Sequence, residues 1–220
     1  MSFSFPKITV ITGHYGCGKT NVAVNIALKL AETQKVTVVD LDIVNPYFRT
    51  ADFGDLFGSR GVELVAPMYA NSNLDIPALS FDLGGIVNGE GSVVIDVGGD
   101  PEGAIALGRY GDLLKNRSDL SLYCVVNKYR YLTSTAEEAT ELLSEIKAAS
   151  GLPCNGIINN SNLGKLTDNE TVKASLEYAE QVAKKADCPL IFTCSEEKNL
   201  DGITPAMPVN IYVKPLWEQF

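Results

Sequence analysis

The clearest chemical signal in the sequence is a glycine-rich segment that matches the pattern G-x-x-x-x-G-K-[ST] in full. It reads Gly13-His14-Tyr15-Gly16-Cys17-Gly18-Lys19-Thr20. Loops of this type turn backbone N–H groups toward phosphate oxygens, and the helix that follows adds the positive end of its dipole. We expect all of these residues, and Asn21 after them, to bind a nucleotide. Lys19 should contact the β- and γ-phosphates as a catalytic cation, and Thr20 should bind Mg²⁺.

Two acidic residues, Asp40 and Asp42, stand at the end of the apolar run Val38-Val39. A carboxylate that leaves a buried strand needs a cation or hydrogen-bond donors. We assign Asp40 to the Mg²⁺ site and Asp42 to the catalytic positioning of the attacking water. For either residue, capping of a following helix is the alternative.

A third segment, Val93-Val94-Ile95-Asp96, ends an apolar run in an acid and is followed by Gly98 and Gly99. We expect Asp96 to hold Mg²⁺ through water, and the two glycines to bring a backbone N–H against the γ-phosphate. Residues 42–49 and 96–110 would then be switch segments that respond to hydrolysis. An ordinary strand-to-helix turn is the alternative for the glycine pair.

These motifs must be positioned by a regular alternation of strands and helices. The patterns predict strands over 7–12, 36–40, 63–66, 92–96, 120–127, 156–159, 190–194 and 209–213, and helices over 19–33, 76–87, 103–114, 135–150 and 169–185. Residues 67–77 and 195–208 should be irregular connections. This order predicts an α/β protein of one domain, residues 1–220, with a mostly parallel twisted sheet and helices on both faces, the three-layer sandwich of a P-loop NTPase.

The composition disfavours several classes of function. A formal net charge of −9 argues against non-specific DNA binding, which needs clustered Lys and Arg. No apolar run approaches the ~20 residues that span a bilayer, so we expect no membrane attachment. The five cysteines form no C-x-x-C pair, and no secretory signal is apparent, which together favour the cytoplasm.

With these three segments in order, the sequence resembles the MinD/ParA/CobQ-type family of P-loop ATPases, within the SIMIBI class. The resemblance implies that Lys19 and Thr20 serve phosphate and Mg²⁺, that Asp42 serves the water and that Asp96 is the Walker B acid. It also implies that an Asn after the run Gly156-Ile157-Ile158 reads adenine. Asn159 is our first choice and Asn160 the alternative, because a carboxamide offers both a donor and an acceptor.

The sequence departs from this family at His14, which stands where the family has its signature lysine. That lysine is understood to act across a homodimer, so a nucleotide-dependent homodimer is kept only as a hypothesis. His14 is either a substitute donor or a surface histidine with no special role. The segment Asn127-Lys128-Tyr129-Arg130 is similar to the N-K-x-D motif of GTPases, but Arg130 cannot accept the guanine N–H groups, which favours ATP over GTP.

The leading functional hypothesis is a weak Mg²⁺-dependent ATPase that acts as a nucleotide-controlled switch for an unidentified protein partner. Its cofactors would be ATP and Mg²⁺. One alternative is an ATP-dependent ligase, similar to dethiobiotin synthetase, that activates a small carboxylate substrate. A second alternative is a nucleotide-binding scaffold that does not hydrolyse its ligand.

Overall fold

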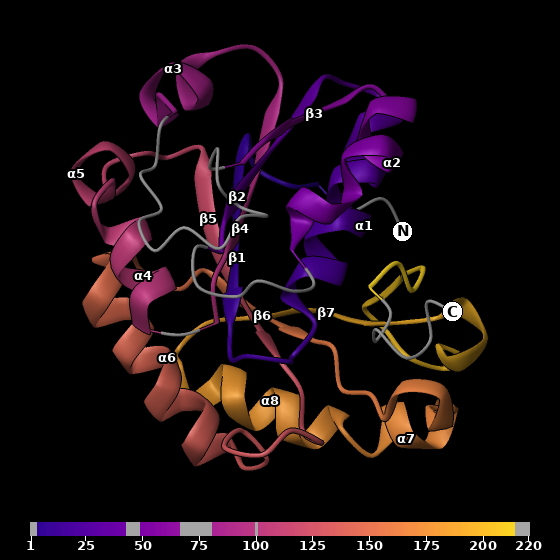
Figure 1. Cartoon of the computed structure of the whole chain (residues 1–220). Helices are drawn as coiled ribbons and strands as arrows, with labels where there is room; N and C mark the ends of the chain where they lie inside the picture. The colour runs from indigo at the N-terminus through magenta and orange to yellow at the C-terminus, as the bar shows by residue number, and fades with distance from the viewer. Residues whose placement is uncertain (1–3, 43–48, 67–80, 100, 214–220) are drawn as a thin grey trace.

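The computed structural model describes residues 4–42, 49–66, 81–99 and 101–213 (Figure 1). Its centre is an eight-stranded sheet in the order β3-β2-β4-β1-β5-β6-β7-β8, in which every pair of neighbours is parallel. The strands are β1 (Ile8–Gly13), β2 (Val36–Leu41), β3 (Val62–Val65), β4 (Ser92–Val97), β5 (Leu120–Val126), β6 (Gly156–Asn159), β7 (Leu190–Ser195) and β8 (Ala206–Pro208).

Helices connect these strands. They are α1 (Lys19–Ala31), α2 (Gly54–Ser59), α3 (Leu83–Asn88), α4 (Pro101–Gly108), α5 (Gly111–Leu114), α6 (Ala136–Ser150), α7 (Asn169–Lys173) and α8 (Leu176–Lys185). Three short 3₁₀ helices are η1 (Thr50–Phe53), η2 (Gly164–Leu166) and η3 (Glu197–Asn199). None of the helices in the described ranges has both the length and the apolar character needed to cross a bilayer.

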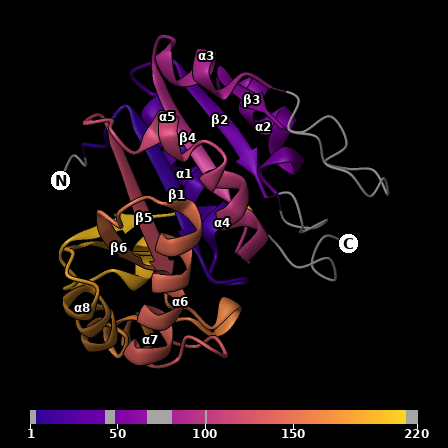
Figure 2. The same ribbon diagram turned by 90° about the vertical axis from the view of Figure 1, so that its left-hand side faces the viewer.

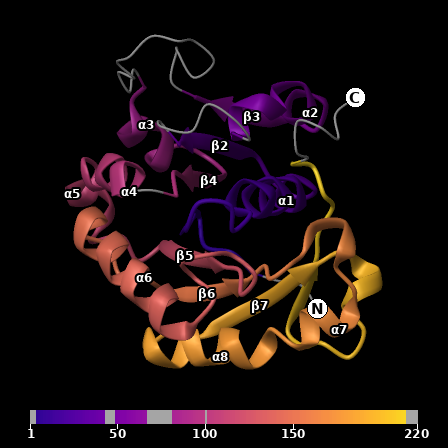
Figure 3. The same ribbon diagram turned by 60° about the horizontal axis from the view of Figure 1, so that its bottom comes forward.

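The sheet is buried on both faces because its apolar residues point alternately to two helical layers. Ile11 packs with α1 and with Phe57 of α2, whereas Ile8 and Val10 pack with α3, α4 and α5. Helices α6 and α8 cover the same second face further along, over β5 and β6. Figure 2 shows α4, α5 and α6 in front of the strands, and Figure 3 shows α1 and α6 on opposite sides of them. The expected α/β three-layer sandwich is confirmed.

Two expected helices are divided in the structure. Residues 103–114 form the end of α4 and all of α5, because the N–H of Tyr110 bonds to the carbonyl of Leu107, an i to i−3 bond that tightens the end of α4. Residues 169–185 divide into α7 and α8 at Ser175, whose hydroxyl donates to the carbonyl of Val172. Helix α2 and strand β8 were not expected, and residues 67–77 lie outside the described residues.

The expected strand over 209–213 is wrong. The N–H of Val209 still donates to the carbonyl of Ser195 in β7, but the chain after it bonds to side chains of α1 and forms no strand. The Asn25 amide donates to the carbonyl of Asn210 at 2.9 Å, and its oxygen accepts from the Asn210 N–H at 2.8 Å. The Asn21 oxygen accepts from the N–H groups of Tyr212 and Val213. Two carboxamides therefore replace a strand partner for the backbone of this segment.

Replacing Asn25 should loosen this attachment. In Asn25→Ala, the N–H and the carbonyl of Asn210 both lose their partner on α1, so we expect the free energy of unfolding to fall by about 1–2 kcal/mol. Urea denaturation measures the change. Glu145→Ala, at an exposed position of α6, is the control and should change it by less than about 0.5 kcal/mol. Equal stabilities of the two variants would contradict the role given to Asn25.

Candidate functional site

The glycine-rich loop lies between β1 and α1, at the carboxyl edge of the sheet. Gly18 precedes α1 in the left-handed conformation, with φ 89°, which a residue with a side chain rarely adopts. No side chain caps the N-terminus of α1, and its first turn contains no acidic residue. The first N–H groups of the helix are therefore left to an external acceptor, as a phosphate-binding helix requires.

Lys19 is almost completely buried and curls back over this loop, where its Nζ donates to the carbonyl of His14 at 3.3 Å. Gly99, from the turn after β4, lies against the same atoms. A Cβ built on Gly99 would come within 2.6 Å of Lys19 Nζ and within 2.6 Å of the backbone N of Tyr15. The structure thus brings together the loop, its lysine and the glycine turn, and the expected contact of this turn with the γ-phosphate stays a prediction.

The Asp96 carboxylate is fully buried, and neither of its oxygens has a hydrogen-bond partner among the described residues. Burial raises the pKa of Asp96 to about 8, with further contributions from the nearby carboxylates of Asp40 and Asp42. The positive charge of Lys19 and the nearby Thr20 hydroxyl both favour the ionised carboxylate and oppose that rise in pKa. An unpaired buried acid beside a phosphate-binding loop needs a cation. The oxygen-rich surroundings fit Mg²⁺, which takes one or two protein oxygens together with phosphate and water.

Asp40 stands next to Asp96, since β2 and β4 pair these residues in register, but its carboxylate is already engaged. It pairs with Nε of the buried Arg49 at 3.2 Å and accepts from the backbone N–H groups of Ala51 at 3.0 Å and Asp42 at 2.9 Å. Asp40 therefore anchors Arg49 and Ala51, where the described chain resumes after residues 43–48, and its expected place in the Mg²⁺ site stays a prediction. Asp42 is buried at the end of β2, and its role with water stays a prediction.

The two asparagines that we expect to bind the adenine base, Asn159 and Asn160, are both buried. Asn159 donates to the hydroxyls of Ser175 and Thr193, and its oxygen accepts from Ser161. The amide of Asn160 donates to the carbonyl of Cys17 at 2.8 Å. Asn159 therefore organises the turn after β6, and Asn160 supports the phosphate-binding loop from beneath. The Asn160 oxygen accepts from the Cys194 thiol at 3.3 Å, and the expected contact of either asparagine with adenine stays a prediction.

Three further residues of the expected cofactor site have defined surroundings. Burial and, to a lesser extent, the charge of Lys19 lower the pKa of His14, which favours its neutral form and disfavours a role in place of the family's lysine. Burial raises the pKa of the Cys17 thiol, which makes it a packing residue of the loop. The side chain of Asn21 faces Asn210 and Tyr212, not the loop, so its expected contact with the nucleotide is not made by the side chain.

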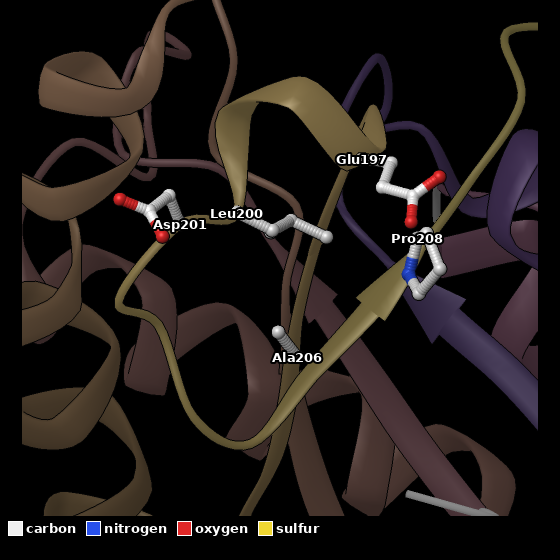
Figure 4. A pocket seen from close by; sticks show the side chains of 5 residues that line it. All are labelled: Glu197, Leu200, Asp201, Ala206 and Pro208. Carbon is white, nitrogen blue, oxygen red and sulfur yellow. The ribbon is translucent and has the colours of Figure 1, made fainter.

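A separate hollow of about 330 Å³ lies beside η3 and β8 (Figure 4). Glu197, Leu200, Asp201, Ala206 and Pro208 line it. Two of its residues are acidic and none belongs to the glycine-rich loop, so it is unsuited to phosphate groups.

One residue near the loop was missed by the sequence analysis. The guanidinium of Arg130 lies 3.6–3.8 Å from the position that a Cβ on Gly16 would occupy. From the sequence we concluded only that Arg130 cannot accept the guanine N–H groups as a carboxylate would. Its proximity to Gly16 depends on the pairing of β5 with β1, which no local pattern reveals.

A strand, a phosphate-binding loop and a helix on a parallel sheet, with an acid at the end of the adjacent strand, define the P-loop NTPase fold. Comparison with solved structures gives the same fold. The cell division protein FtsY from Thermotoga maritima has a TM-score of 0.60 at 17% identity, covering 89% of this chain and 64% of its own length. The signal recognition particle 54 kDa protein from Aeropyrum pernix, in complex with GDP, has a TM-score of 0.56 at 16% identity, covering 88% and 42%.

FlhF, complexed with GTP and Mg²⁺, has a TM-score of 0.51 at 14% identity, covering 85% of this chain and 64% of that one. This chain thus spans less than two thirds of the length of these structures. No family model matches the sequence, and no curated protein matches it either. At such low identities the comparisons establish the fold of the chain.

The unpaired Asp96 carboxylate should cost stability when no metal is bound. Its folded-state pKa of about 8 lies above the unfolded value of about 4, so stability falls as pH rises between these values. Asp96→Asn removes this cost. We expect its melting temperature without nucleotide to exceed that of the wild type by roughly 5 °C at pH 8, with a smaller gain at pH 5. A variant that melts below the wild type at both pH values would contradict this account of Asp96.

The close approach of Gly99 to Lys19 gives a second prediction. In Gly99→Ala, the added methyl group must displace the lysine ammonium or the backbone of Tyr15, so nucleotide affinity should fall at least about tenfold while the fold remains. Calorimetric titration measures the affinity. Gly58→Ala in α2, where a Cβ meets nothing within 4 Å, is the matched control and should bind as the wild type does.

Proposed function

We propose that this protein binds Mg²⁺-ATP in the loop Gly13–Thr20 and hydrolyses it slowly, as a switch for a protein partner. The observation that carries the proposal is the meeting of Lys19, Gly99 and the unpaired Asp96 at one edge of the sheet. A cation, a close-packed backbone and a buried acid in one place match the needs of a nucleoside triphosphate with its metal.

In this proposal the loop amides and the first turn of α1 bind the phosphates, and Lys19 neutralises charge on the β- and γ-phosphates. Thr20 and Asp96 hold the Mg²⁺, which would stabilise negative charge on the phosphates during transfer. Asp42 orients the attacking water. Asp40 takes no direct part and keeps the end of β2 in place through Arg49.

The switching role follows from the position of the turn after β4. Gly99 touches the loop, and a Cβ on Gly103, in α4, would lie within 2.6 Å of Gly98. A γ-phosphate arriving beside Lys19 would therefore press on a turn that is packed directly against α4. The movement of α4 would present a different surface to the partner. The order of the three motifs supports a place in the MinD/ParA/CobQ-type family, and the nucleotide-dependent homodimer stays a hypothesis.

ATP is preferred to GTP in this proposal. Guanine presents two neighbouring N–H donors that need an acceptor such as a carboxylate. The loops after β5 and β6, residues 127–135 and 160–163, contain no Asp or Glu. Two of the solved structures of similar fold hold GDP or GTP, so GTP is the competing ligand to test.

Lys19→Ala tests the proposal, with Lys29→Ala as control, since Lys29 lies further along α1 and pairs only with the exposed Glu32. We expect Lys19→Ala to lower ATP affinity by roughly 10- to 100-fold and to abolish phosphate release, because it removes charge-assisted hydrogen bonds to the phosphates. Lys29→Ala should behave as the wild type. Titration with ATP and GTP and a phosphate-release assay supply both readings.

Each other outcome has a definite meaning. Equal phosphate release by Lys19→Ala and the wild type would show that this site does not hydrolyse ATP. Tight ATP binding without release would leave a scaffold, and turnover that needs a small carboxylate would indicate a ligase. Tighter binding of GTP would reverse the proposed base preference.

A further inference from the structure

A second cation faces the glycine-rich loop, and the proposed function gives it no role. The Arg130 guanidinium lies over Gly16, with Cζ and Nε each 3.6 Å and one terminal nitrogen 3.8 Å from the position of a Cβ on that glycine. Gly16 itself has φ 75°. A side chain at position 16 would therefore meet both an unfavourable backbone conformation and the guanidinium.

The loop that carries Arg130 is firmly attached to the body of the protein. The fully buried Asn127 accepts from the N–H groups of Tyr129 and Asn162, and its carbonyl accepts from the N–H of Arg130. The Tyr129 hydroxyl donates to the carbonyl of Thr171 at 2.7 Å. The base of the side chain is thus fixed next to the phosphate-binding loop, which reduces the entropy lost when its head binds a ligand.

The guanidinium itself has no acceptor among the described residues: no carboxylate lies within 4.0 Å of it and no hydrogen bond from it is formed, although the chain as a whole is acidic. A guanidinium carries five N–H donors, accepts nothing and stays charged, so its natural complement is an anion with several oxygens. The nearest place in the fold built to receive such an anion is the loop below it.

Its position along the loop indicates which part of a nucleotide it meets. In the sheet, β1 lies between β4, which carries Asp96, and β5, which leads to Arg130. Gly99 lies against the loop at His14 and Tyr15, near Lys19, whereas the Arg130 guanidinium lies beside it at Gly16. Arg130 therefore approaches from the flank opposite the candidate Mg²⁺ residue, away from the turn assigned to the γ-phosphate.

We infer that Arg130 is a nucleotide-binding residue that neutralises the phosphates common to the di- and triphosphate, on the flank of the loop opposite Asp96. This inference rests on the proposed function and adds to it a residue outside the three motifs. It predicts that Arg130 sets affinity for both nucleotides alike and leaves their ratio unchanged.

The test uses calorimetric titration of the full chain with ADP and with a non-hydrolysable ATP analogue, each with Mg²⁺. Arg130→Ala should weaken both by about tenfold, the loss expected for a charge-assisted contact. Arg130→Lys keeps the charge without the planar fork, and should weaken both by about threefold. Lys128→Ala is the matched control from the same loop, because its ammonium donates to the carbonyl of Ala174 at 2.7 Å, and it should bind within about twofold of the wild type.

Arg130 is exposed, so its variants should melt without nucleotide as the wild type does, which separates binding from folding. Unchanged affinity of Arg130→Ala for both nucleotides would overturn the inference and leave the proposed function standing. A loss confined to the ATP analogue would also overturn it, by placing the guanidinium at the γ-phosphate. Failure of the wild-type chain to bind either nucleotide would overturn both proposals.

Discussion

The structure depends on the parallel pairing of β2, β4 and β1, which places one phosphate-binding loop and two acidic strand ends at a single edge. Asp40 and Asp96 occupy paired positions on neighbouring strands, where two buried charges repel each other. The protein resolves this conflict unequally. Arg49 and two backbone N–H groups satisfy Asp40, while Asp96 keeps no partner among the described residues. In the proposed function, Asp96 is the carboxylate that is left to hold the metal.

The fold and the phosphate-binding loop could be predicted because their signals are local. The run from Gly13 to Thr20 and the alternation of apolar strands with helices require no knowledge of distant contacts. The extra division of helices at Tyr110 and Ser175 escaped prediction, because single backbone or hydroxyl bonds end a helix there and the apolar pattern continues through them.

The contacts of Asp40 and Asn159 and the position of Arg130 beside the loop could not be predicted, since each depends on how separate segments pack against one another. Asp40 is engaged by Arg49, and Asn159 by Ser175 and Thr193. The residue types show that these polar side chains need hydrogen-bond partners, but the sequence contains many donors and acceptors that could serve equally well. Only the packed sheet determines which of them is near.

Helix α1 makes two contacts that matter for the site, one at its N-terminus and one along its side. Its first residues close the phosphate-binding loop, and Asn21 and Asn25 on its side grip the backbone of Asn210 and Tyr212 near the far end of the chain. The segment that contains Asn210 and Tyr212 cannot shift along α1 without breaking these hydrogen bonds. Helix α1 therefore joins the phosphate-binding loop directly to residues 210–213, two segments almost two hundred residues apart in the sequence.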